Sequence, residues 1–184
     1  SETTPERPQT YYGSSKLKAD KELMAMSDRE FKAAIIRPPM AYGGGMAPGN
    51  MLRLIRLVNK HIPLPFGSAR NSRDFINVKN LVEFIHLAVE KEVEGVFYPT
   101  DKVPYSTRNV VEEISRQLGV HTVNLPSPSI FLKLVEKVRP DLYQKLWGDV
   151  VIDRQLALSA IGYEPRYTLE DGIREMVESF KQQK

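Results

Sequence analysis

The chain of 184 residues has no cysteine and a single tryptophan. Without cysteine it can form no disulfide, no thiolate nucleophile and no thiolate-bound metal site. No apolar run approaches the roughly 20 residues that a membrane-spanning helix needs, so no membrane span is expected. An excess of one charge is also lacking, because 26 basic side chains face 23 acidic ones and leave a net charge of +3. That excess is too small to indicate nucleic acid as a partner.

The sequence also lacks clustered metal ligands and the features of a signal peptide. His61, His86 and His121 are scattered, and none has a second ligand at a metal-binding spacing, so no metal is expected. Residues 1–9 are polar and lack the apolar core of a signal peptide, which favours a cytoplasmic setting. The remaining composition, with 41% hydrophobic residues, is that of an ordinary globular domain.

The hydrophobic pattern predicts strands that alternate with helices, which is typical of an α/β protein with a parallel sheet. Strands are predicted at residues 31–36, 74–78, 96–99 and 120–125, with a short extended segment at 64–66. Helices are predicted at residues 12–26, 50–60, 81–91, 107–118, 129–137, 141–146, 154–161 and 169–181.

Helix boundaries follow from residues with a preference for helix ends. Asn50 is expected to cap the helix 50–60, and Asn80 to precede the next one. Gly95 and Gly119 are expected to end helices. Thr168-x-x-Asp171 is close to a capping box at the start of the last helix.

Two signatures of nucleotide binding are missing. Neither the G-x-G-x-x-G turn of a dinucleotide-binding sheet nor the G-x-x-x-x-G-K-[ST] phosphate loop occurs. The predicted strands are also fewer than the about six of a doubly wound sheet. The chain therefore looks like the second part of a larger α/β protein, with a mostly helical last third.

Tyr12 and Lys16 are four residues apart, so their side chains share one face of a helix. A neighbouring ammonium favours the phenolate, and such a tyrosine can exchange a proton with a substrate hydroxyl near neutral pH. The residues between them, Gly13 to Ser15, are small and leave that face open. A surface tyrosine beside a solvated lysine is the alternative, because Tyr-x-x-x-Lys is short enough to occur often by chance.

Several segments, in order along the chain, resemble the extended short-chain dehydrogenase/reductase superfamily, in particular its NAD-dependent nucleotide-sugar epimerase/dehydratase branch. Pro8–Lys16 is similar to the catalytic segment of that branch, and Ala34–Gly43 to its next strand and the loop leading to the substrate. Leu64–Gly67 with Ser72–Val78 is similar to its nucleotide-contacting stretch. Ile161–Pro165 resembles its closing Leu-Gly-Trp-x-Pro signature, with tyrosine in place of tryptophan. Each match alone is weak, but their order and spacing together are specific.

The resemblance implies catalytic and cofactor roles for three residues. Tyr12 would be the acid/base that removes a hydroxyl proton as hydride moves to the nicotinamide of NAD. Lys16 would hold the nicotinamide ribose and favour the Tyr12 phenolate. The turn at Pro38 would lie against the nicotinamide.

The resemblance also implies a second group of residues, which would bind the nucleotide-sugar substrate. Leu64, Pro65 and Phe66 would line the nucleobase. Arg73 would meet the diphosphate, where a planar guanidinium suits paired oxygens. Lys145 lies near the position where many relatives carry a second diphosphate-binding arginine, and would substitute for it as a point charge. In addition, Asn50 would join the substrate loop, a role compatible with its expected role as a helix cap.

Parts of such an enzyme have no counterpart in this sequence: the Gly-rich cofactor turn, the acidic residue for the adenosine ribose and an upstream Ser/Thr. The resemblance therefore implies an α/β fold with the carboxyl-terminal half of a Rossmann-type parallel sheet and a mostly helical substrate-binding subdomain. Residues 1–45 would be a remnant of the NAD-binding Rossmann domain, which carries the Tyr-x-x-x-Lys helix. Residues 46–184 would form the substrate-binding region, from which elements at about 74–100 return to the sheet. The chain alone is expected to be inactive, and unpaired strand edges such as that of 31–36 are expected to drive homo-oligomerisation or self-association.

These features favour the carboxyl-terminal part of an NAD-dependent nucleotide-sugar epimerase with a UDP-sugar substrate. A dehydratase needs a further acid/base pair that this chain lacks, so it is the less favoured alternative. A hydroxysteroid dehydrogenase or sugar reductase with the same Tyr and Lys, or a catalytically silent binding module, also stays open. The basic residues Arg53, Arg56, Lys60 and His61 are interpreted as the edges of a packed helix, not as a nucleic-acid or membrane surface.

Overall fold

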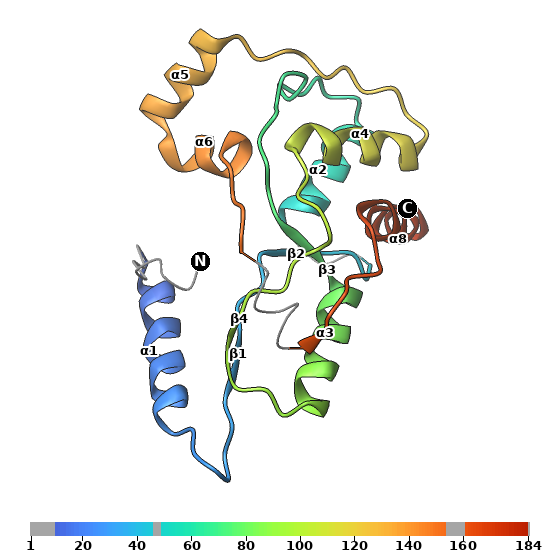
Figure 1. Cartoon of the computed structure of the whole chain (residues 1–184). Helices are drawn as coiled ribbons and strands as arrows, with labels where there is room; N and C mark the ends of the chain where they lie inside the picture. Colours follow the sequence, from blue (N-terminus) through green and yellow to red (C-terminus); the bar gives the residue numbers. More distant parts are fainter. Residues whose placement is uncertain (1–9, 46–48, 154–160, 184) are drawn as a thin grey trace.

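The computed structural model describes residues 10–45, 49–153 and 161–183 (Figure 1). Its helices are α1 (Tyr11–Ala25), α2 (Asn50–Asn59), α3 (Val78–Glu90), α4 (Thr107–Leu118), α5 (Ser129–Val138), α6 (Pro140–Trp147) and α8 (Leu169–Gln182). Its strands are β1 (Ala34–Ile36), β2 (Met40–Tyr42), β3 (Phe75–Asn77) and β4 (Gly95–Phe97). No helix in these ranges combines the length and apolar character needed to cross a membrane.

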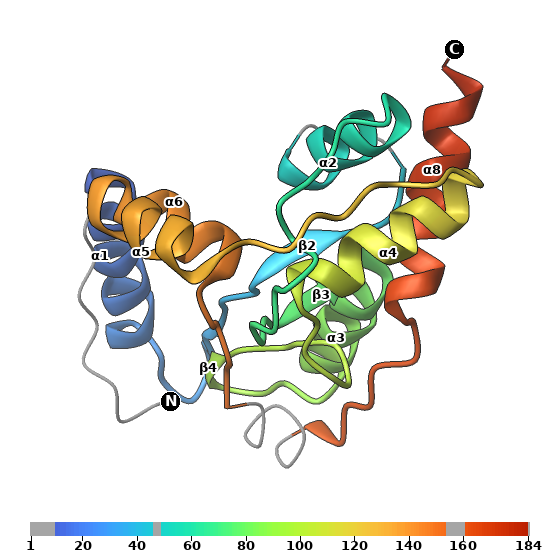
Figure 2. The same cartoon turned by 90° about the horizontal axis from the view of Figure 1, so that it is seen from above.

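The strands pair in parallel, as an α/β fold requires. β1 pairs with β4, with Ala34 opposite Gly95, and β2 pairs with β3, with Met40 opposite Phe75. Figures 1 and 2 show α1 and α3 on opposite sides of the β1–β4 pair. The predicted fold class is therefore confirmed.

Most of the buried apolar side chains form a core between α2, α4 and α8. Ile55, Ile114 and Ile173, one from each helix, are fully buried there. A second core lies under α3, where the Phe84 ring is 5.9 Å from the Phe97 ring of β4. Because both cores depend on contacts between distant segments, they hold the strands and helices in a single arrangement.

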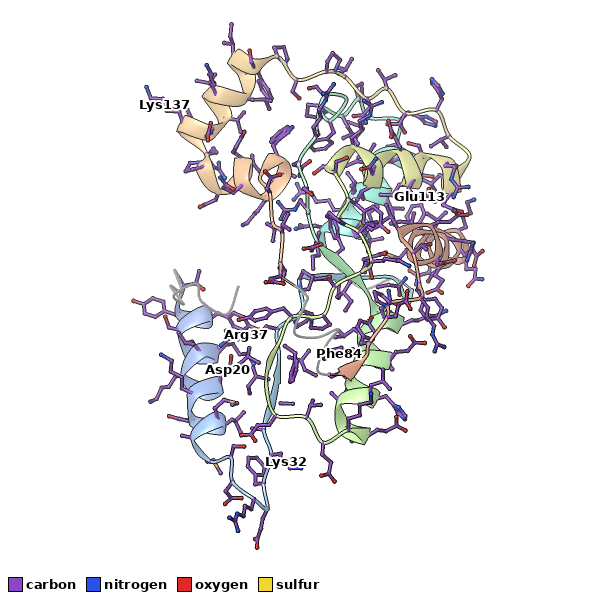
Figure 3. The ribbon with its side chains drawn as sticks, in the orientation of Figure 1. Asp20, Lys32, Arg37, Phe84, Glu113 and Lys137 are labelled. Carbon is purple, nitrogen blue, oxygen red and sulfur yellow. The ribbon has the colours of Figure 1, made fainter. Side chains whose placement is uncertain are left out.

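Helix α1 differs from the other helices of the two cores, because none of its residues is buried. Arg37, which follows β1, binds α1 through the Asp20 carboxylate. Arg37 Nε donates to Asp20 Oδ2 at 2.8 Å, and Arg37 Nη2 lies 2.7 Å from the same oxygen. Figure 3 shows the two side chains in the space between α1 and β1. This half-buried ion pair, rather than apolar packing, fixes α1 beside the sheet.

A buried polar cluster joins α3 to the segment that precedes α8. Asn80, which has no exposed surface, donates to Asp101 Oδ1 at 2.7 Å and to the Tyr167 carbonyl at 2.8 Å. Its side-chain oxygen Oδ1 accepts from the Arg166 and Tyr167 backbone amides. Asn80 therefore lies within α3 and does not precede it, and Asn77 caps the helix by accepting from the Lys79 amide.

Several other boundary predictions are wrong for identifiable reasons. Asn50 is the first residue of α2 and does not cap it, because the N-cap position is Gly49 and no side-chain cap is present. Gly95 begins β4, with a positive φ of 126°, and α3 ends earlier at Glu90. The predicted strand 120–125 is reduced to a single bridge between Asn124 and Leu64.

Other predictions hold, and one element was not expected. Gly119 ends α4 in the left-handed conformation, and the capping box of Thr168 and Asp171 starts α8. Strand β2 is not predicted from the sequence, because Pro38 and Pro39 directly precede it and proline usually ends a strand. The predicted helix 154–161 falls mainly outside the described residues.

The edge of β1 opposite β4 makes no strand pairing within the described ranges. Unpaired strand edges invite pairing with another chain. We expect the 184-residue chain to self-associate as its concentration rises, which light scattering over a concentration series measures. A strictly monomeric mass at the highest concentration would contradict this expectation.

Candidate functional site

A cavity of about 390 Å³ lies between α2, α6 and the strands β2 and β3. All six residues for which the sequence predicts substrate binding line it: Asn50, Leu64, Pro65, Phe66, Arg73 and Lys145. A second hollow, of about 520 Å³, lies beside the start of α4 and contains none of them. We take the smaller cavity as the candidate site, because residues far apart in the sequence converge on it.

The face of α2 that lines the cavity follows the helical repeat. Of its five lining residues, four follow the spacing i, i+3, i+4 and i+7, namely Asn50, Arg53, Leu54 and Leu57, and the fifth is Met51. On the other side of the helix, Ile55 and Val58 are fully buried and so fix its orientation. The motif-based prediction missed Arg53 and the two leucines, although their period is visible in the sequence.

The segment from Leu64 to Phe66 forms an apolar wall of the cavity. The Leu64 amide donates to the Val123 carbonyl at 3.0 Å, and the Phe66 amide donates to Asn124 Oδ1 at 3.1 Å. The Phe66 ring lies 5.3 Å from the ring of Trp147, at the end of α6. These contacts hold an aromatic and aliphatic surface of the kind on which a planar base can pack.

Arg73 reaches the cavity from the residues that lead into β3. Its Nη1 donates to the carbonyls of Gln144, at 2.7 Å, and Gly148, at 2.8 Å. Burial lowers the pKa of Arg73, and the Asp149 carboxylate opposes this effect, so the guanidinium stays charged at neutral pH. Because these bonds anchor it to the end of α6, Arg73 also helps to position Lys145.

Tyr12 and Lys16 share one face of α1, as their spacing predicts. Lys16 Nζ lies 5.7 Å from the centre of the Tyr12 ring, and 72% of Tyr12 is exposed. Thr10 caps the helix one turn earlier, where its hydroxyl accepts from the Gly13 amide at 3.0 Å. The pair is therefore held on a regular helix with the hydroxyl and the ammonium open to a ligand.

The structure does not bring all the predicted residues into one cavity. Tyr12, Lys16 and Pro38 are absent from its lining. Pro38 is exposed and precedes by two residues Met40, which does line the cavity. Figure 1 shows that the amino-terminal end of α1, which carries Tyr12, points toward α6. The predicted substrate-binding residues thus line the cavity, whereas Tyr12 and Lys16 lie on a separate, exposed face of α1.

Parallel strands flanked by helices define an α/β protein. Residues 1–98, more than half of the sequence, match the model of the NAD dependent epimerase/dehydratase family. The chain belongs to this family. It is 35% identical over 181 residues to a UDP-glucose 4-epimerase of Vibrio cholerae, covering 95% of this chain and 55% of that protein.

Solved structures confirm the fold. UDP-glucuronic acid 4-epimerase from Bacillus cereus, in complex with NAD, matches 98% of this chain with a TM-score of 0.75 and 19% identity. dTDP-glucose 4,6-dehydratase from Bacillus anthracis, also in complex with NAD, matches 99% with a TM-score of 0.73 and 20% identity. In each case 55% of the other chain is covered. This chain therefore spans about half the length of these relatives.

Proposed function

We propose that the chain is the carboxyl-terminal, substrate-binding part of an NAD-dependent nucleotide-sugar epimerase. The observation that carries the proposal is the cavity, in which an apolar wall at Leu64–Phe66 faces the cations Arg73 and Lys145. A nucleotide sugar has matching parts, a flat base and a charged diphosphate. The identity with a UDP-glucose 4-epimerase favours UDP as the nucleotide and epimerisation over dehydration.

The exposed face of α1 fits the nicotinamide ribose of NAD. Within the described residues, Lys16 makes no ion pair, and its ammonium is held only over the Tyr12 ring. Three N–H donors therefore remain for ribose hydroxyls. Pro38 would border the same region from the connection between β1 and β2. Residues 1–45 would thus belong to the cofactor-binding domain and residues 46–184 to the substrate-binding region.

The chemistry follows from the two groups. NAD, when bound, would supply the acceptor for a hydride from the sugar carbon and the donor that returns it to the opposite face. Tyr12, as the phenolate, takes the proton of the hydroxyl on that carbon, so that a carbonyl forms, and gives the proton back when hydride returns. Lys16 would hold the nicotinamide ribose beside Tyr12, over whose ring its ammonium lies. Arg73 and Lys145 hold the diphosphate while the sugar turns.

Calorimetry of the 184-residue chain with UDP tests the binding role. We expect UDP to bind, and Lys145→Gln to weaken it about threefold to tenfold, because an exposed ion pair with phosphate is lost. Lys137→Gln is the matched control, since Lys137, labelled on α5 in Figure 3, is exposed and does not line the cavity. Absence of UDP binding by the unaltered chain would contradict the proposed function.

A further inference from the structure

Arg53 is a cation of the cavity to which no role has yet been given. It lies on α2 and lines the cavity, whereas Arg56, three residues later, does not. Among the residues that the structure describes, no hydrogen bond or ion pair holds the Arg53 side chain. Two other exposed arginines are paired, Arg108 with Glu112 at 2.6 Å and Arg174 with Asp171 at 2.6 Å, whereas Arg56 is unpaired among the described residues but lies outside the cavity. The guanidinium of Arg53 is thus free to meet a ligand.

The charges that line the cavity all have the same sign. Arg53 comes from α2, Arg73 from the residues before β3 and Lys145 from α6, and no aspartate or glutamate of the described ranges is part of the lining. Arg73 is already tied to two carbonyls by Nη1. Three cations that converge from three elements repel one another unless an anion lies between them. A ligand with more than one negative charge relieves this repulsion best.

The position of Arg53 along α2 indicates which part of the ligand it meets. Leu57, one turn later on the same face, leads toward the apolar wall at Leu64–Phe66. Four residues of helix advance about 6 Å, so Arg53 lies about that far from Leu57 along α2, toward the amino-terminal end of the helix. The amino-terminal end of α2 carries no side-chain cap, so its amides and its dipole add positive potential beside Arg53.

We propose that Arg53 is a third diphosphate-binding residue, which faces the phosphates from α2 across the cavity from Lys145. This inference rests on the proposed function, because it takes the base to lie at Leu64–Phe66. It predicts that the site discriminates among ligands of one nucleoside by their number of phosphates. Arg53 would contribute to the binding of UDP, less to that of UMP and nothing to that of uridine.

Calorimetric titration of the 184-residue chain with uridine, UMP and UDP tests the inference. Arg53→Gln is expected to weaken UDP binding about tenfold, as for the loss of a charge-assisted hydrogen bond, and to leave uridine binding unchanged. The loss should shrink at high salt, because the interaction is electrostatic. Arg56→Gln, on the same helix but outside the cavity, is the matched control and should bind all three ligands as the unaltered chain does.

The outcomes are distinct. If Arg53→Gln binds UDP within twofold of the unaltered chain, Arg53 does not contact the diphosphate and the inference is wrong. An equal loss for uridine and UDP would show that the substitution alters the shape of the cavity, which also overturns it. If the unaltered chain binds neither uridine nor UDP, the proposed function fails as well.

Discussion

Turnover of the full gene product should fall about 100- to 10,000-fold when Tyr12→Phe is introduced, because the ring loses the hydroxyl that would exchange the proton of the sugar. The phenyl ring keeps its contact with the Lys16 ammonium, which lies 5.7 Å from the ring centre. The substitution is therefore expected to remove the proton transfer and to leave the helix intact. Steady-state kinetics with NAD and a UDP-sugar measure the effect on kcat.

Tyr11→Phe is the matched control for this experiment. Tyr11 precedes Tyr12 on the same helix and is 98% exposed, but it does not share a face with Lys16. It should keep normal turnover, and both variants should bind UDP normally, since neither residue lines the cavity. A normal kcat in the Tyr12→Phe variant would contradict the proposed acid/base role of Tyr12. The product distinguishes the two reactions, because an epimerase yields an isomer and a dehydratase releases water.

The largest loss of stability is expected for Asn80→Ala, about 3–4 kcal/mol in the free energy of unfolding. The substitution would remove one of the hydrogen bonds to the buried Asp101 carboxylate, which keeps those from Asn77 and Tyr42. It would also remove the oxygen that the amides of Arg166 and Tyr167 donate to. Val82→Ala on the exposed side of α3 is the control, because 60% of Val82 is exposed. Urea unfolding followed by circular dichroism compares the two variants.

Asn80→Asp separates the loss of hydrogen bonds from a change of shape. The aspartate has nearly the size of asparagine, but it cannot donate to Asp101 and places a second carboxylate beside it. Burial already raises the pKa of Asp101, and a like charge raises it further. The folded state would then bind a proton more tightly than the unfolded state, so the cost of Asn80→Asp should be greatest at neutral pH and shrink as pH falls. An Asn80→Asp variant as stable as the unaltered chain would contradict this account.

The sequence was sufficient where one local interaction decides the outcome. The Tyr-x-x-x-Lys spacing places Tyr12 and Lys16 on one helix face wherever the helix lies, because the helical repeat alone sets it. Gly119 and the box of Thr168 and Asp171 mark helix ends for similarly local reasons. Asn50 and Asn80 were misassigned because asparagine has the same local preference at a cap whether or not tertiary contacts use it elsewhere.

Tertiary structure decided what depends on contacts between distant segments. The cavity exists because the end of α6 is bonded to Arg73, which is more than seventy residues away from Gly148 in sequence. Arg53 lines the cavity and Arg56 does not, although both are arginines of α2. The difference depends on which face of α2 is buried. Residue type and spacing therefore determined the family resemblance and the Tyr12–Lys16 pair by themselves. Packing alone determined which of the many basic side chains face the proposed diphosphate, because burial of one helix face chooses among chemically equal residues.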